Sequence, residues 1–187
     1  MDDLIFTIGH STRTLPELVA LLRQVEVTLL VDVRAFPRSR TTPQFNEDTL
    51  PHSLASAGIA YRHLRALGGR RSHRKGAPPS LNTYWRVAAF RNYADYAETD
   101  DFRAGLAALR ELERDHRCAI MCAEVLWWRC HRRIITDYLL AAGRRVEHIM
   151  SAGQIVPATL TPGTLVTAKG TLRYPAPEDG APFIGGR

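Results

Sequence analysis

The sequence predicts an α/β fold, a single domain with a mostly parallel central sheet of about five strands flanked by helices. Short apolar runs alternate along the chain with segments whose apolar residues recur at helical spacing. The segment 27–33 is a nearly continuous run of β-branched residues and leucine, which is typical of a strand buried on both faces of a parallel sheet. The length of 187 residues and the 45% of apolar residues suit one domain with its own core.

The first part of the chain alternates between strand and helix. Thr14 and Pro16 are typical of a helix start, and Gly58 is typical of a helix stop. The elements expected there are strand 4–8, helix 15–25, strand 27–33, helix 46–57 and strand 59–64. Each helix would connect two parallel strands and bring their carboxyl ends to the same edge of the sheet.

The second part continues the alternation after a basic loop. The elements expected are loop 65–84, helices 90–97 and 101–114, strand 118–122, helix 130–142 and strand 144–150. The loop is rich in glycine, proline and serine, which favours a functional lid or a flexible segment. Residues 1–150 would form the α/β domain, and 151–187 a Pro/Gly-rich C-terminal extension that packs on it or trails from it, with a short hairpin near 168–170.

The composition indicates which classes of partner the protein can be expected to bind. The formal net charge of +6 and the pI near 9.6 favour an anionic partner, and arginine, which supplies all but two of the 25 basic residues, binds phosphate and carboxylate with two parallel donors. We expect a cytoplasmic protein with no membrane partner, since no apolar run is long enough to cross a bilayer and no basic, apolar leader begins the chain. Three cysteines cannot all pair, so a disulfide scaffold is not expected.

The segment 121–133 holds the densest group of reactive side chains. It contains two thiols, Cys122 and Cys130, with Glu124, His131 and three arginines, on the turn between a predicted strand and a predicted helix. Ligands bind at the carboxyl ends of the strands in open parallel sheets, and helix amino termini and nearby cations lower the pKa of a thiol. Cys130 is expected in the first helical turn.

Three other strand ends should face the same crevice, where they add His10, Asp32 and His63. The leading hypothesis is therefore an enzyme that binds a small anionic substrate containing phosphate or sulfur, and such an enzyme would be a cysteine-dependent transferase or hydrolase. The predicted catalytic residues are Cys122 or Cys130 as the nucleophile, with Glu124 or His131 transferring protons. The predicted substrate-binding residues are His10, Ser11, Asp32, Arg34, Arg38 and Arg132.

Structural roles compete with several of these assignments. Asp32 interrupts an apolar strand, and pairing with Arg34 would satisfy its charge. His10 could belong to the start of the next helix. Cys118 is expected in the core, and the two tryptophans 127 and 128 in the core or in a lid.

Two non-catalytic readings remain open. The sequence requires no cofactor, but Cys122, Cys130 and His131, with His10, are possible metal ligands, although the spacing is not that of a zinc ribbon and neighbours on a regular helix seldom reach one metal. Nucleic acid could bind through the Arg70–Arg74 loop, with Tyr84 and Trp85 available for stacking, unless the loop is only solvated and flexible.

Several motifs resemble the domain-of-unknown-function family 488 (DUF488) over residues 4 to about 150. They are Thr7–Thr12, Leu30–Arg34 with Phe36–Ser39, Pro43–Asn46, Leu67–Gly69, Tyr93–Tyr96, and Met121–Glu124 with Cys130–Arg132. The resemblance implies an α/β domain and assigns no substrate.

The order of elements is also similar, more distantly, to rhodanese-like and cysteine-phosphatase domains. In those families a cysteine at a strand end forms a covalent adduct inside a loop of backbone N–H groups, and Cys122 takes that place here. The loop Ala123–Arg129 contains no glycine, so the close anion cradle of those families does not carry over to this chain.

Overall fold

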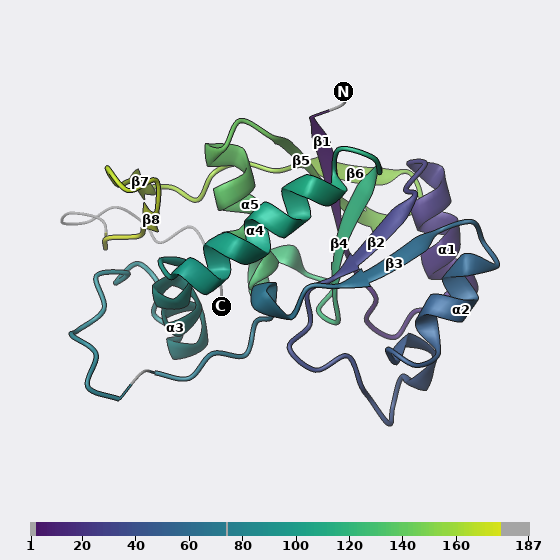
Figure 1. Cartoon of the computed structure of the whole chain (residues 1–187), viewed down its shortest axis with the longest axis horizontal. Coiled ribbons are helices and arrows are strands. Elements are labelled where there is room, and N and C mark those ends of the chain that lie inside the picture. The colour runs from purple at the N-terminus through teal and green to yellow at the C-terminus, as the bar shows by residue number, and fades with distance from the viewer. Residues whose placement is uncertain (1–2, 74, 177–187) are drawn as a thin grey trace.

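A six-stranded sheet forms the centre of the structure, with strand order β3-β2-β4-β1-β5-β6 (Figure 1). The computed structural model describes residues 3–73 and 75–176. The strands are β1 (Leu4–Gly9), β2 (Leu29–Asp32), β3 (Ala60–His63), β4 (Cys118–Cys122), β5 (Arg145–Ser151) and β6 (Gln154–Pro157). The first five are mutually parallel and β6 runs antiparallel to β5, which confirms the predicted α/β class with one strand more than expected.

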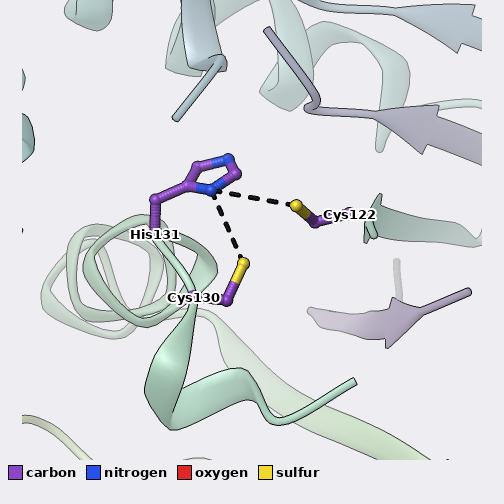
Figure 2. A group of neighbouring side chains, drawn as sticks. All are labelled: Cys122, Cys130 and His131. Carbon is purple, nitrogen blue, oxygen red and sulfur yellow. Dashed lines mark hydrogen bonds between the residues drawn. The ribbon is translucent and has the colours of Figure 1, made fainter. Parts of the chain in front are cut away.

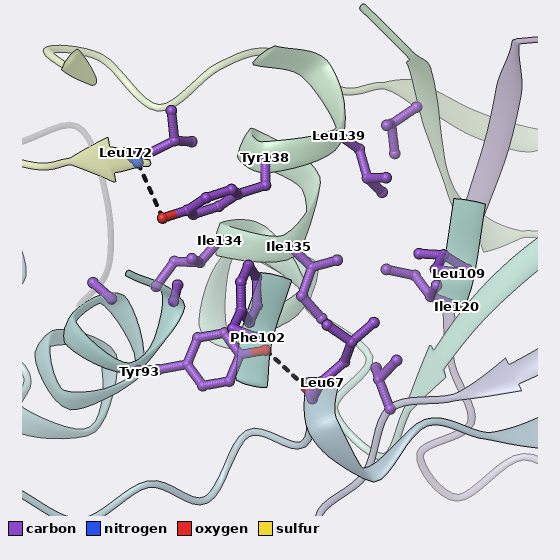
Figure 3. Packing of buried hydrophobic residues seen from close by; sticks show 14 of the residues in the cluster. Leu67, Tyr93, Phe102, Leu109, Ile120, Ile134, Ile135, Tyr138, Leu139 and Leu172 are labelled. Atoms are coloured by element: carbon purple, nitrogen blue, oxygen red, sulfur yellow. Dashed lines mark hydrogen bonds between the residues drawn. The ribbon is translucent and has the colours of Figure 1, made fainter. Parts of the chain in front are cut away.

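Helices cover both faces of this sheet. They are α1 (Leu15–Gln24), α2 (Leu50–Ala55), α3 (Ala88–Ala97), α4 (Asp100–Leu112) and α5 (Arg132–Ala141), with 3-10 turns η1 (Pro43–Phe45), η2 (Arg65–Leu67) and η3 (Trp127–Arg129). Leu18 of α1 and Leu54 of α2 pack in one core cluster, whereas Phe102 of α4 and Ile135 of α5 pack in the other (Figure 3).

β4 differs from its two neighbours in the sheet in the face on which the following helix packs. Its neighbours in the sheet, β1 and β2, are followed by α1 and α2, but β4 itself is followed by α5 on the other face. The carboxyl end of such a strand opens into a crevice between connections that diverge to opposite faces. Cys122, the last residue of β4, lies at that opening.

Two helices begin later than the sequence predicts. The helix expected over 46–57 begins at Leu50, because the side chain of Asn46 accepts a hydrogen bond from the Ser39 N–H (2.6 Å) and does not cap a helix. The helix expected over 130–142 begins at Arg132. Cys130 therefore precedes the helix and has extended backbone, with φ −127° and ψ 148°.

The described part of the C-terminal segment packs on the domain. Residues 154–157 pair with β5, and the expected hairpin is present as β7 (Leu165–Val166) and β8 (Leu172–Arg173). The side chain of Tyr174 is buried in the core beside α5, and its N–H donates to the side chain of Asn82 (2.9 Å). The rest of the predicted extension, 177–187, lies outside the described residues.

The helices of the described chain are all too short or too polar to cross a lipid bilayer.

Candidate functional site

A pocket of about 420 Å³ opens at the carboxyl end of the sheet, beside the end of β4. Five segments contribute to its wall: the loop after β2, the residues after η2, the start of α3, the end of β4 and the turn before α5. The side chains and backbone that line it are Arg34, Ala35, Phe36, Arg38, Gly69, Arg70, Ala89, Phe90, Cys122, Ala123, Arg129, Cys130 and His131. The predicted cysteines and histidine of the 121–133 segment therefore meet in one cavity.

Two thiols and an imidazole lie together in this pocket (Figure 2). The Nδ1 atom of His131 is 3.9 Å from the Sγ atom of Cys122 and 3.5 Å from the Sγ atom of Cys130. All three atoms lie within 4.8 Å of one another, and the three cysteines of the chain are free thiols. We call Cys122, Cys130 and His131 the Cys–Cys–His centre.

The His131 ring is held in one orientation. Its Nε2 atom lies 2.9 Å from the carbonyl oxygen of Val33, so Nε2 carries the hydrogen and donates it. In the neutral ring this leaves the lone pair of Nδ1 directed at the two sulfurs. The ring of Tyr93 contacts the His131 ring edge to face, with 5.0 Å between the ring centroids. The Tyr93 hydroxyl donates to the carbonyl of Leu67 (2.7 Å), which holds the tyrosine ring in place beside His131.

Arg132 lies behind the centre and not in the pocket wall. Its side chain is 1% exposed, and its guanidinium donates to the Sγ atom of Cys130 (3.4 Å), to the Thr7 hydroxyl (3.4 Å) and to the carbonyl of Glu124. The Thr7 hydroxyl is also 2.8 Å from Nδ1 of His148. Arg132 thus joins the loop after β4 to the centre, and its role as a substrate ligand stays a prediction.

The pKa values of the two thiols are shifted in opposite directions. The neighbouring Cys130 sulfur and burial raise the pKa of Cys122 well above its ordinary value. Burial alone would raise the pKa of Cys130, but the Cys122 thiol, His131 and the Arg132 guanidinium together lower it well below its ordinary value. Of the two thiols, Cys130 is therefore the one that loses its proton more readily.

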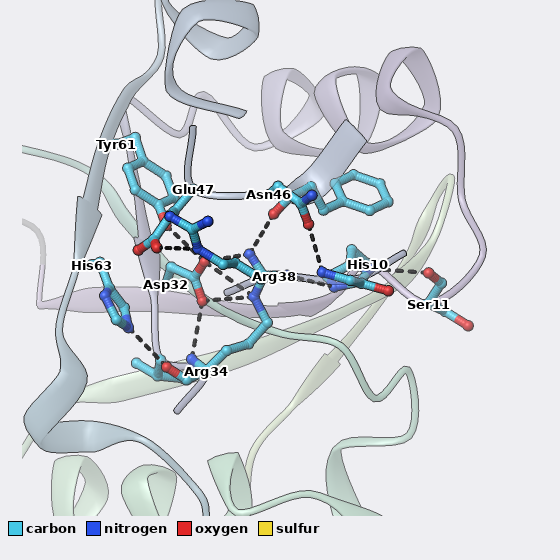
Figure 4. A network of polar contacts seen from close by, with 12 residues as sticks. His10, Ser11, Asp32, Arg34, Arg38, Asn46, Glu47, Tyr61 and His63 are labelled. Carbon is cyan, nitrogen blue, oxygen red and sulfur yellow. Dashed lines mark hydrogen bonds and ion pairs between the residues drawn. The ribbon is translucent and has the colours of Figure 1, made fainter. Parts of the chain in front are cut away.

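A second polar network fixes the wall formed by the loop after β2 (Figure 4). Asp32, which is fully buried, accepts hydrogen bonds from Arg34 at Oδ2 (2.6 Å) and from the Tyr61 hydroxyl (2.8 Å). Arg34 also donates to the carbonyl of Phe45 (2.6 Å), and its Nη1 lies 3.2 Å from Nε2 of His10. This is the Asp32–Arg34 pairing that the sequence offered as a structural role.

His10 is a neutral part of that network. Its Nδ1 atom donates to the carbonyl of Ser11 (2.9 Å), and its ring stacks on Phe45 at 4.2 Å. Burial, with a smaller contribution from the Arg34 guanidinium, lowers the pKa of His10 to about 4. The helix that follows is capped by Thr14, so His10 does not form its cap.

One known family matches the middle part of this chain. A family described as a domain of unknown function matches residues 14–139. The chain belongs to the DUF488 family. The matched residues include β2, β4 and the Cys–Cys–His centre, whereas the Thr7–Thr12 motif lies before the matched range. Comparison with curated proteins and with solved structures gave no match.

The remaining predicted site residues of this DUF488 domain lie around the pocket with different exposure. Arg38 lines the pocket and pairs with Glu47 (2.9 Å). The exposed side chain of Glu124 accepts the N–H of Leu126 (3.1 Å) and does not line the pocket. The N–H of Ser11 donates to the carbonyl of Ala123 (2.9 Å), so this turn supports the loop after β4.

The residues predicted to bind nucleic acid differ in how far they are exposed to solvent. The guanidinium carbon of Arg71 lies 3.6 Å from the centroid of the Tyr96 ring, and its Nε donates to the carbonyl of Gly68 (2.9 Å). The Arg71 guanidinium therefore makes its contacts within the protein. Tyr84 and Trp85 are both 6% exposed, which leaves little ring surface for base stacking. Arg70 is exposed, and Arg74 lies outside the described residues.

Eight of the thirteen residues that line the pocket of this DUF488 domain were not predicted as catalytic or substrate-binding residues. Phe36, Gly69, Arg70 and Arg129 are among these eight. Two signals in the sequence pointed toward them: paired glycines that precede the basic run, and an arginine directly before Cys130. Neither signal predicts that the loops carrying Gly69 and Arg129, which are distant in the sequence, line the same pocket.

Proposed function

We propose that the pocket binds a small anionic substrate, carrying a phosphate or a sulfur-containing anionic group, against the Cys–Cys–His centre. The observation that carries this proposal is the charge of the pocket wall. Arg34, Arg38, Arg70 and Arg129 line it, and no carboxylate does among the described residues. A concave site with charge of one sign concentrates ligands of the opposite sign.

The four guanidiniums are not equally available. Arg34 is neutralised by Asp32, and Arg38 pairs with Glu47 at the surface. Arg70 and Arg129 have no ion-pair partner within the part of the chain that the structure describes. These two residues, on different segments of the wall, are therefore the expected anion ligands, and guanidinium suits oxyanions because it donates two parallel hydrogen bonds.

The wall also has an apolar part. Phe36, Phe90 and three alanines line the same cavity, and Phe36 is 62% exposed. A volume of about 420 Å³ lies in the range of pockets for organic ligands. The proposed substrate is thus an anion with an organic portion.

Cysteine chemistry on that substrate stays a prediction. The Nδ1 atom of His131 is placed to accept a thiol proton, after which the sulfur could attack an electrophilic phosphorus or sulfur atom while the leaving group departs with the bonding electrons. This reaction requires a cysteine that is free of other bonds.

Calorimetric titration with inorganic phosphate, thiosulfate and phenyl phosphate at low salt tests the binding proposal in chelator-treated, reduced protein. We expect binding that weakens as salt increases, and a loss of roughly tenfold in Arg129→Gln or Arg70→Gln. Arg110→Gln, an exposed arginine of α4, is the matched control and should bind as the wild type does. Absence of binding at millimolar ligand, or equal losses in Arg110→Gln and Arg129→Gln, would refute the proposal.

A further inference from the structure

We propose that Cys122, Cys130 and His131 bind a thiophilic divalent cation, with Zn²⁺ as the preferred ion. A fourth coordination position would be open to the pocket. The inference rests on the proposed function only in its last step, where the substrate anion approaches that open position. The metal site itself stands on the geometry of the three side chains.

The separations between the donor atoms suit a tetrahedral ion. Zinc binds thiolate sulfur at about 2.3 Å and imidazole nitrogen at about 2.0 Å, which places sulfur and nitrogen about 3.6 Å apart and two sulfurs about 3.8 Å apart. The observed distances from Nδ1 of His131 are 3.5 Å to Cys130 and 3.9 Å to Cys122, and no pair of the three atoms is more than 4.8 Å apart. Shifts of a few tenths of an ångström to about 1 Å would complete the coordination.

The local backbone explains how adjacent residues can both be ligands. Neighbours on a regular helix point in different directions, but Cys130 has extended backbone and α5 begins only at Arg132. The Cys130 and His131 side chains therefore converge on Cys122, which comes from the end of β4. The objection that the sequence raises against this ligand pair does not apply to the observed turn.

The atoms around the three ligands also suit a metal site. A ligating histidine usually donates its other N–H to a fixed acceptor, and His131 donates Nε2–H to the carbonyl of Val33. A ligating thiolate accepts hydrogen bonds, and Arg132 donates to the sulfur of Cys130 (3.4 Å). Both contacts orient the donor atoms toward one point.

The fourth position belongs to the pocket. Within the described residues the cluster of possible ligands has three members. His10, the other histidine considered from the sequence, uses Nδ1 on the Ser11 carbonyl and faces Arg34 with Nε2. Structural zinc sites have four protein ligands, whereas three ligands and an open position are typical of sites that act on a substrate. The guanidiniums of the wall would attract an anion to that position.

Cobalt substitution tests the site directly. Reduced, chelator-treated protein is titrated with Co²⁺ without oxygen, and we expect one equivalent to bind with the intense sulfur-to-metal charge-transfer absorption of thiolate ligands. Cys122→Ser and Cys130→Ser should each weaken this absorption, and His131→Ala should lower the affinity at least tenfold. Cys118→Ser is the matched control, because Cys118 is a buried cysteine at the other end of β4 and should leave the spectrum unchanged.

A second measurement needs no variant. Alkylation of each cysteine in the wild-type protein is followed by peptide mass spectrometry, with Zn²⁺ and with chelator. We expect Zn²⁺ to slow labelling of both Cys122 and Cys130 at least tenfold. Equal labelling rates in the two conditions, or a wild-type cobalt spectrum without charge-transfer absorption, would overturn the metal site and favour free thiols.

The two proposals fail separately. If Co²⁺ binds with thiolate absorption and none of phosphate, thiosulfate and phenyl phosphate binds or changes the spectrum, the metal site holds and the anion-binding function is wrong. If the anions bind to chelator-treated protein while Co²⁺ shows no thiolate absorption, the reverse is true. Arg129→Gln should retain the cobalt absorption, because this side chain lines the pocket outside the three ligands.

Discussion

The backbone of Gly69 lies against the imidazole of His131 so closely that a Cβ atom on residue 69 would be 2.3 Å from Nδ1. A side chain at residue 69 would need the space that the nitrogen facing both sulfurs occupies. A glycine far from the 121–133 segment in the sequence thus determines where His131 can lie.

Gly69→Ala should therefore displace His131 from the two cysteines. We expect Co²⁺ affinity to fall at least tenfold, while the circular dichroism spectrum stays that of a folded protein. Ser72→Ala, in the same loop but exposed, is the control and should bind as the wild type does. Unchanged affinity in Gly69→Ala would mean that the loop gives way and the histidine does not.

The buried and exposed ion pairs of the pocket wall should differ sharply in their effect on stability. Asp32→Ala leaves the Arg34 guanidinium, which is 6% exposed, without its counter-charge, and we expect the free energy of unfolding to fall by roughly 3–5 kcal/mol. Denaturant titration measures this loss. Glu47→Ala breaks the pair with Arg38, whose side chain is 69% exposed, and should cause no measurable loss. Similar values for the two variants would contradict this assignment.

Acid should destabilise the fold through two buried histidines. Burial lowers the pKa of His10 to about 4 and that of His148 to about 3, from an ordinary value of 6.5. Between these values the unfolded chain binds protons that the folded protein does not, so stability is present above pH 6.5 and is lost as the pH falls toward 4. Each histidine contributes at most about 1.4 kcal/mol per pH unit. His148→Gln should show a shallower decline in denaturant titrations across this range.

Asp137 should oppose this trend. Burial raises the pKa of its carboxyl group to about 6 from an ordinary value of 3.8, while its Oδ1 accepts the N–H of Thr161 (2.8 Å). The folded protein therefore holds a proton that the unfolded chain releases, and this contribution to stability is lost as the pH rises from 3.8 to about 6. Asp137→Asn removes the contribution, so its stability should rise more steeply with pH than that of the wild type. A parallel pair of curves would show that folding does not shift the pKa of Asp137.

The apolar wall should distinguish among anions. Phenyl phosphate should bind more tightly than inorganic phosphate because its ring can pack against Phe36 and Phe90. We expect Phe36→Ala to weaken phenyl phosphate binding by about fivefold, a loss typical of one aromatic contact, without changing phosphate binding. Exposed Leu81 lies outside this pocket, and Leu81→Ala is the control. An equal loss for both ligands would indicate a general disturbance of the site.

The sequence predicted the centre of the site better than its periphery. The strand ending at Cys122 and the turn before Arg132 follow from apolar patterns, and parallel strands place such turns at one edge. Strand order is a long-range property, so the position of β4 between β1 and β2 could not be predicted. The same limit applies to Gly69 and Arg129, which meet only through the arrangement of their loops. Cys130 was placed in the helix because an apolar period does not mark its first residue.

The family match ends at residue 139, but the sheet does not. β1 lies before the matched range and pairs on one side with β4 and on the other with β5, which lies after it. A protein fragment limited to residues 14–139 would leave one edge of β4 with unpaired backbone N–H and C=O groups, and such an edge promotes aggregation. We therefore expect the shortest folding unit of this chain to be longer than the matched residues 14–139, and boundaries for truncated forms should follow the strand pairing.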